Sequence, residues 1–223
     1  MVAILFDLEG TLVETAEANA IEIRQFRDKV LKKLIALGIP SGSLRGIQST
    51  CLMQNKAFDI VEQTFDSEES ENFYVKLDAF LKKYELNWAD TSKIFDDTLC
   101  TLKKLSQQYV LGIVTNTSKE AANKMLFNHK IGNFFRVVIT RNEARKLKPN
   151  PEGIRIALDR LNQTSFVFVG NSSYDSTAAK DAGGQFILVK RDPKKALKIP
   201  SAYVVSSLTE ISRLIDEVNL IKL

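Results

Sequence analysis

Apolar and polar positions follow a different pattern in each of three successive parts of the chain, and the first part is a short apolar run. Residues Val2 to Phe6 are apolar, and the run ends abruptly at Asp7, with Glu9 and Gly10 close behind. A short apolar run bounded by a polar, glycine-containing turn predicts a buried strand of a parallel sheet. Asp7 would then lie at the carboxyl end of that strand, where open α/β sheets bind their ligands.

Asp7 and Glu9 are two residues apart, so on an extended chain their side chains point to the same side. Gly10 has no Cβ and therefore permits a sharp change of direction. The pattern predicts two carboxylates that converge above the sheet, although these residues alone fit a solvated loop equally well. The rest of the chain decides between the two interpretations.

The second part of the chain has a helical pattern throughout. Apolar residues recur at helical spacing from Glu14 to Leu37, and Gly38 and Pro40 end this helix. Two further helices are predicted over Cys51–Thr64 and Glu68–Tyr84, with Leu52 facing inward in the first of them. Because no strand pattern occurs between Glu14 and Trp88, residues 14–90 are predicted to form a separate helical domain. Trp88 is expected to pack at its junction with the rest of the protein.

From Thr91 onward, apolar runs of strand length alternate with amphipathic segments of helix length. The predicted strands are Tyr109–Val114, Phe134–Ile139, Phe166–Val169, Phe186–Val189 and Tyr203–Val205. The predicted helices are Asp96–Gln108, Glu120–Asn128, Pro151–Leu161, Ser176–Ala182 and Leu208–Val218. This alternation predicts right-handed crossovers and an α/β fold with a doubly wound parallel sheet. Residues 1–13 and 91–223 would form this core.

Composition narrows the functional classes. The 223 residues carry 31 basic and 27 acidic side chains, a net charge of +4 that is too small to indicate nucleic-acid binding. The densest basic stretch, 190–195, is expected to be a solvated loop. No apolar run approaches the roughly 20 residues of a membrane span. The apolar start is too short for a signal peptide, and Cys51 and Cys100 are expected to be buried thiols, which together favour a reducing cytoplasm.

Four polar clusters follow the ends of predicted strands or lie on an adjacent loop: Asp7 with Glu9, Thr115 with Asn116, Lys148, and Asn171 with Asp175. All strand ends of a parallel sheet face one edge, so the clusters are expected to meet in one crevice. Carboxylates bind hard cations such as Mg²⁺, and a hydroxyl, a lysine and backbone amides hold phosphate oxygens. An aspartate can form an aspartyl-phosphate as a nucleophile, and a glutamate can transfer a proton.

Each residue alone also has an ordinary structural interpretation. Thr115 could be a strand-end hydroxyl, Lys148 a surface lysine, Asn171 a turn residue and Asp175 a helix N-cap. The only histidine, His129, is expected at the surface, which leaves little room for a Ser-His or Cys-His catalytic pair. The four clusters together favour an active site.

In this order and on this scaffold, the clusters resemble the haloacid dehalogenase (HAD) superfamily of phosphohydrolases. The string D-L-E-G-T-L is similar to the family's D-x-D-G-T-L, and the helical segment after it resembles the family's helical cap. I-V-T-N-T-S resembles the second motif. K-L-K-P-N-P resembles the third, in which the lysine precedes proline, and this selects Lys148 over Lys146. V-G-N-S-S-Y-D resembles the fourth, G-D-x-x-x-D.

The resemblance implies a Mg²⁺-dependent phosphatase that acts on a small phosphorylated metabolite. Asp7 would attack phosphorus and ligate Mg²⁺, and Glu9 would act as general acid and base while its backbone carbonyl ligates the metal. Thr115 and Lys148 would hold the phosphoryl oxygens, with Asn116 beside them in the substrate-binding motif. Asn171 would ligate the metal, and Asp175 would ligate it or brace it through water.

Two residues depart from the family pattern. Glu9 replaces the second aspartate, and its ordinary pKa is close to that of aspartate, so the acid–base role is retained. D-x-E-G-T also occurs in the family's enolase-phosphatase branch, and it argues against a dehalogenase, which resembles D-x-Y-G-T. Asn171 replaces an acidic residue, so the site has one formal charge fewer and weaker metal binding is expected.

Other interpretations remain open at this point. A phosphomutase would need a group on the cap that holds its intermediate, for which Arg24, Arg27 and Arg45 are weak candidates. A phosphorylation-sensing receiver domain would be shorter and would have no helical insert. A catalytically weak, HAD-like binding protein is supported only by Asn171. The sequence leaves the oligomeric state and the identity of the substrate open.

Overall fold

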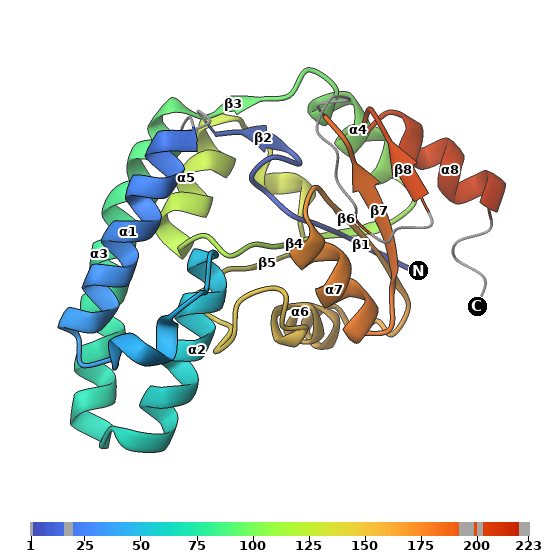
Figure 1. The fold of residues 1–223 in the computed structure, drawn as a ribbon. Helices are drawn as coiled ribbons and strands as arrows, with labels where there is room; N and C mark the ends of the chain where they lie inside the picture. The colour runs from blue at the N-terminus through green and yellow to red at the C-terminus, as the bar shows by residue number, and fades with distance from the viewer. Residues whose placement is uncertain (1, 16–19, 192–198, 200–202, 219–223) are drawn as a thin grey trace.

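A computed structural model describes residues 2–15, 20–191, 199 and 203–218 (Figure 1). Its centre is a parallel sheet of six strands in the order β5-β4-β1-β6-β7-β8. The strands are β1 (Ala3–Phe6), β4 (Val110–Val114), β5 (Val137–Ile139), β6 (Phe166–Gly170), β7 (Gln185–Val189) and β8 (Tyr203–Val205). The predicted doubly wound parallel sheet is therefore confirmed, with β1 as a central strand.

Alternating side chains of β1 enter two separate apolar layers. Ile4 and Phe6 pack with one group of helices, and Ala3 and Leu5 pack with the other. The first group comprises α4 (Thr98–Leu105), α5 (Lys119–Asn128) and α8 (Glu210–Val218), and the second comprises α6 (Glu152–Leu161) and α7 (Ser173–Asp181). Because both faces are covered, β1 is apolar at every position, as a buried parallel strand requires.

Along the sequence, three long helices lie between β1 and β4, the next strand of the six-stranded sheet. They are α1 (Ala20–Ala36), α2 (Thr50–Thr64) and α3 (Ser67–Thr91), with a 3₁₀ turn η1 (Ser41–Leu44) between the first two. Figure 1 shows the three helices grouped at one side of the sheet. They share an apolar cluster of their own, which includes Val30, Met53 and Leu77 and also takes in Leu147 from the core.

The helical segment differs from the prediction at both ends. The chain does not enter a helix at Glu14, because β2 (Val13–Glu14) pairs antiparallel with β3 (Lys93–Ile94). At the other end, α3 continues beyond Tyr84 to Thr91, since its buried stripe extends through Glu85 and Ala89. The division into a core and a domain of residues 14–90 stays a prediction.

Trp88 packs against Phe26 of α1, with ring centroids 4.9 Å apart, so its partner lies within the helical segment. The predicted strand Phe134–Ile139 is also shorter in the structure, because its first residue belongs to a 3₁₀ turn, η2 (Gly132–Phe134). None of the described helices has the length and apolar character needed to cross a bilayer.

Several predictions about individual side chains are wrong. Cys100 is exposed and Cys51 is only partly buried, so the expectation of two buried thiols fails. Leu52, expected to face inward, is also exposed, because the buried stripe of α2 runs through other positions. His129 is partly buried and lies 2.9 Å from the Ser92 hydroxyl through Nε2, and burial lowers its pKa.

The basic stretch 190–195 is described only up to Arg191, and the remainder lies outside the described residues. Arg191 is not simply solvated. Its guanidinium forms an ion pair with Asp97 at 2.7 Å and donates a hydrogen bond to the carbonyl oxygen of Thr11 at 2.7 Å. Asp97 also accepts a hydrogen bond from the backbone N–H of Leu208. These contacts join the turn after β1 to Arg191, just after β7, and, through Asp97, to the starts of α4 and α8.

Candidate active site

Lys148 lies at the centre of the predicted site and connects the ends of three strands. Its ammonium is 2.6 Å from Asp7 Oδ1 and 2.7 Å from Asp175 Oδ1, and it donates a hydrogen bond to the carbonyl oxygen of Val114 at 2.8 Å. Only 4% of Lys148 is exposed. Asp7 follows β1, Val114 ends β4 and Asp175 lies just after β6, so one cation holds three neighbouring strand ends together.

The acidic side chains at this edge outnumber the basic ones. Burial raises the pKa of Asp7 to about 6, against the opposing charge of Lys148. Burial also raises the pKa of Glu9 to about 7. For Lys148 burial is the largest single influence and lowers the pKa, but the charges and hydrogen bonds of Asp175 and Asp7 together outweigh burial and raise the pKa of Lys148. Two carboxylates, Asp7 and Asp175, therefore share one ammonium, with the Glu9 carboxyl nearby on the same turn, and the site favours a further positive charge.

Glu9 has a partner that the sequence analysis did not identify. The Thr117 hydroxyl donates a hydrogen bond to Glu9 Oε2, and Thr117 is itself buried. Thr115, the predicted phosphate ligand, accepts a hydrogen bond from the Thr117 backbone N–H at 3.2 Å through its hydroxyl. The two-residue spacing in T-N-T was a usable signal, because alternate residues after a strand can turn to the same side. Thr117 holds the glutamate above the sheet.

Asn171 lies directly over the turn after β1. Gly10 has a positive φ of 77°, and a Cβ placed on it would come within 2.0 Å of Asn171 Nδ2. Any other residue at position 10 would therefore be strained in its backbone and would collide with the amide. Gly10 brings the first and fourth motifs into contact, and this explains why the turn needs glycine.

Asp175 is the third residue of α7 and not its N-cap, because Ser172 takes the cap position and α7 begins earlier than predicted. The two side chains form a capping box. Asp175 Oδ2 accepts hydrogen bonds from the backbone N–H of Asn171 and from the N–H and hydroxyl of Ser172. Since Oδ1 binds Lys148, both carboxylate oxygens have partners, which favours a bracing role over direct metal binding.

Asn116 supports the lysine through the backbone. Its Oδ1 accepts a hydrogen bond from the Lys148 N–H at 2.8 Å, and its Nδ2 donates one to the Lys148 carbonyl at 3.1 Å. The amide is thus engaged at both ends. The predicted substrate contact of Asn116 stays a prediction, and the observed contacts of its side chain hold the backbone of Lys148.

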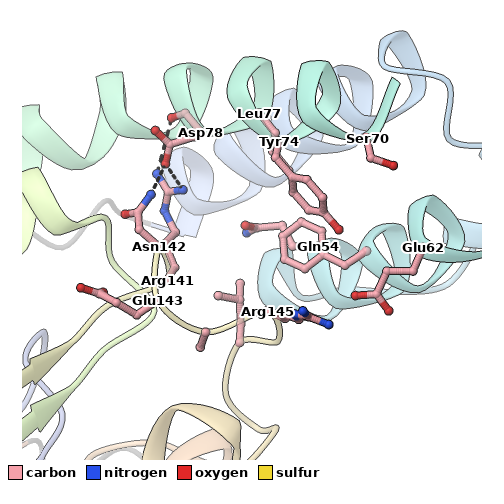
Figure 2. Close-up of a pocket in the computed structure, with 13 residues that line it drawn as sticks. Gln54, Glu62, Ser70, Tyr74, Leu77, Asp78, Arg141, Asn142, Glu143 and Arg145 are labelled. Atoms are coloured by element: carbon pink, nitrogen blue, oxygen red, sulfur yellow. Dashed lines mark hydrogen bonds and ion pairs between the residues drawn. The ribbon is translucent and has the colours of Figure 1, made fainter. Parts of the chain in front are cut away.

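A second group of charged residues, also missed from the sequence, joins α3 to the loop after β5. Figure 2 shows Arg141 and Asn142 from this loop reaching Asp78. The Arg141 guanidinium also contacts both carboxylate oxygens of Glu85 at 3.0 Å, and Glu85 accepts a hydrogen bond from the Ser118 N–H at the start of α5. A cavity of about 480 Å³ opens beside this contact, with Gln54 and Tyr74 among its walls (Figure 2).

Comparison with known proteins places this architecture in a family. The model of the haloacid dehalogenase-like hydrolase family matches residues 4–189. The chain belongs to this family. Both the predicted resemblance and the predicted fold are confirmed for this haloacid dehalogenase-like hydrolase.

Three similar proteins illustrate the membership. Pyrophosphatase PpaX of Bacillus velezensis is 30% identical over 193 residues, which cover 81% of this chain and 79% of that protein. Phosphoglycolate phosphatase of Aliivibrio fischeri is 30% identical over 196 residues, with 81% and 80% covered. A crystal structure of a HAD phosphatase from Thermococcus onnurineus has a TM-score of 0.62 at 25% identity and covers 96% of this chain and 98% of its own. The predicted enzyme class, a phosphatase of this family, agrees with these names.

The oxygen donors at this site fit a hard divalent cation, but few of them are charged. Within the described residues, no three His, Cys, Asp or Glu side chains converge in ligand geometry. A metal would therefore combine the carboxylate of Asp7 with neutral oxygens, namely the amide of Asn171 and the backbone carbonyl of Glu9. Oxygen donors of these kinds suit Mg²⁺, and the excess of acidic groups favours a divalent charge.

Proposed function

We propose that the protein is a Mg²⁺-dependent phosphatase that hydrolyses a small phosphorylated metabolite through an aspartyl-phosphate on Asp7. The observation that carries the proposal is the buried ammonium of Lys148, 2.6 Å from Asp7 and 2.7 Å from Asp175 at the carboxyl edge of the sheet. Lys148 neutralises charge around the carboxylate that meets an anionic substrate. Asp7 is then able to approach a phosphoryl group that its own charge would otherwise repel.

Each remaining residue has a defined task in this mechanism. Asp7 attacks phosphorus in line and expels the leaving alcohol, and Glu9 donates the proton that this oxygen needs. Burial raises the pKa of Glu9 to about 7, so a large fraction of it carries the proton near neutral pH. Glu9 then removes a proton from the water that hydrolyses the acyl phosphate. Mg²⁺ held by Asp7, Asn171 and the Glu9 carbonyl would offset the phosphoryl charge.

The substrate enters between the core and the helical segment, and we assign residues 14–90 as a cap over the site. Two named relatives act on pyrophosphate and phosphoglycolate according to their names, so a small phosphorylated compound is the natural class to test. A phosphomutase has less support: among the cap arginines proposed for it, Arg27 is already bound to Asp28 and Gln48.

The test is phosphate release from a panel of phosphorylated metabolites and an aryl phosphate, with Mg²⁺ or with EDTA. Asp7→Asn serves as the blank, because it keeps the shape of the side chain and removes the nucleophile. Release that needs Mg²⁺ and is absent in the blank supports the proposal. Release that continues in the blank would assign the activity to another group or to a contaminant.

Glu9→Gln is expected to lower kcat by about 10²-fold or more for alkyl phosphates and much less for an aryl phosphate. Gln cannot donate the proton that an alkoxide leaving group requires, whereas a phenolate leaves without it. Steady-state rates on one substrate of each kind measure the difference. Equal losses on both substrates would remove Glu9 from the acid role.

Asn171→Asp is expected to tighten apparent Mg²⁺ affinity by about tenfold, because it adds a formal negative charge to the donor set. A Mg²⁺ titration of aryl phosphate hydrolysis measures the half-saturating concentration for both proteins. Asn123→Asp on the exposed side of α5 makes the same change of net charge outside the site and should leave that concentration unchanged. Identical half-saturation in the parent and Asn171→Asp would exclude Asn171 from the metal site.

A further inference from the structure

The peptide unit between Leu147 and Lys148 is held from two sides by asparagine side chains. On the core side, Asn116 binds the N–H and the carbonyl of Lys148. On the other side, Asn55 of α2 accepts a hydrogen bond from the Leu147 N–H at 2.7 Å and donates one to the Leu147 carbonyl at 2.8 Å. The oxygen of the shared peptide therefore binds Asn55, and its nitrogen binds Asn116.

The residues before Lys148 are docked on the helical segment by further contacts. Leu147 is buried in the apolar cluster of the helices and not in either layer of the core. Lys146 forms an ion pair with Asp59 of α2 at 2.5 Å and lies 3.8 Å from Glu62. The loop thus passes from α2 at residues 146 and 147 directly into the active site at residue 148.

From this arrangement we infer that Asn55 is a positioning residue that couples docking of the helical segment to the placement of the Lys148 ammonium. The inference rests on the proposed function, in which that ammonium must lie between Asp7 and Asp175. Asn55 contributes no group to the reacting atoms. It fixes the backbone from which the lysine side chain extends.

The link between α2 and Lys148 follows from the hydrogen bonds that would remain if α2 moved away from the loop. If α2 leaves the loop, the Leu147 N–H and carbonyl lose their partners together, while Asn116 still binds Lys148 from the core. The lysine then keeps one of its two backbone anchors, and a misplacement on the order of 1 Å is enough to lower a rate about 10²-fold. The docked arrangement is therefore the active one, and Asn55 of α2 acts on the chemistry through the backbone of Leu147.

Asn55→Ala tests the inference through two independent measurements. The kcat for an aryl phosphate should fall about 10- to 100-fold while KM changes less than about twofold, because positioning is lost and substrate contacts are kept. Hydrogen exchange at the Leu147 amide should accelerate, and exchange at the Lys148 amide should stay slow because Asn116 still binds it. Asn72→Ala, an exposed position on α3, is the matched control and should change neither quantity.

Asn55→Asp provides a second variant, since it keeps the acceptor for the Leu147 N–H and replaces the donor to the carbonyl by an oxygen that repels it. Its kcat should be lower than that of the parent. An unchanged kcat in a folded Asn55→Ala protein with faster Leu147 exchange would overturn the inference, and unchanged exchange would overturn the contact itself. If the parent hydrolyses no phosphate ester, the proposed function fails, whereas the exchange comparison still decides whether Asn55 holds Leu147.

Discussion

Asp7→Asn is expected to abolish phosphate release and, at the same time, to stabilise the metal-free protein. Loss of the nucleophile should lower kcat by about four to six orders of magnitude, as in other hydrolases that lose theirs. The gain in stability follows from burial, which raises the pKa of Asp7 from 3.8 to about 6. The ionised carboxylate therefore destabilises the fold, whereas an asparagine resembles the protonated form and carries no charge.

The stabilisation should depend on pH in a defined direction. A carboxyl group whose pKa is higher in the folded than in the unfolded protein contributes its full stabilisation when pH is below the unfolded pKa. This stabilisation is lost as pH rises through the folded pKa. The contribution of Asp7 to the free energy of unfolding therefore falls between about pH 4 and pH 6. The advantage of Asp7→Asn should reach the order of 3 kcal/mol at pH 8 and about half of that at pH 5, since one pKa unit corresponds to about 1.4 kcal/mol.

Urea unfolding in EDTA at pH 5 and pH 8 measures this advantage. Added Mg²⁺ should stabilise the parent more than the variant, because the variant lacks a carboxylate ligand, and so should narrow the difference at pH 8. A variant that is less stable than the parent at pH 8 in EDTA would show that the ion pair with Lys148 outweighs the burial of Asp7.

Lys148→Met should lower both the stability and the activity of the protein, whereas Asp7→Asn lowers the activity alone. It leaves Asp7 and Asp175 buried without their cation, and removing one partner of a buried ion pair costs about 3 to 5 kcal/mol. Activity should fall at least about 10²- to 10³-fold, as when a group that stabilises transition-state charge is lost. The destabilisation should shrink at pH 5, because Asp7 can then take up a proton.

The neighbouring lysine supplies the matched control. Lys146 pairs with Asp59, whose side chain is 48% exposed, so Lys146→Met should change stability by less than about 1 kcal/mol. Combining Lys148→Met with Asp7→Asn should restore part of the lost stability, because one of the two unpaired carboxylates is removed. A double variant no more stable than Lys148→Met alone would contradict the charge argument.

The fold and the principal site residues were accessible from sequence because they depend on local patterns. Apolar runs and strand-end polar residues are read within a few positions, and parallel strands bring their ends to one edge whatever the details of the loops. Asp7, Lys148 and Asp175 meet for this reason. Lys148 also had to be chosen over Lys146, which the resemblance decided and the ion pairs support.

The features that were missed depend on contacts between distant segments. Asn55 and Leu147 are 92 positions apart, and Glu85 and Arg141 are 56 apart, so no local spacing marks them. The short pairing of β2 with β3 likewise joins the two ends of the helical segment, and two residues in each strand are too few to give an alternating apolar pattern in the sequence. Helix-forming periodicity also gave no information on which side of α2 would remain exposed, and Leu52 was misplaced for that reason.

The length of α3 limits how this protein can be re-engineered. The first turns of α3 lie beside the other helices of the helical segment, and its last turns pack along α5 of the core. There Lys124 pairs with Asp90 at 2.6 Å, and Ser118 donates its N–H to Glu85. A chimera that received the helices of a relative in place of 14–90 would therefore keep an α5 surface matched to the wrong helix. Grafting a new specificity onto this scaffold would require the facing residues of α5 and Arg141 to be transferred together with the insert.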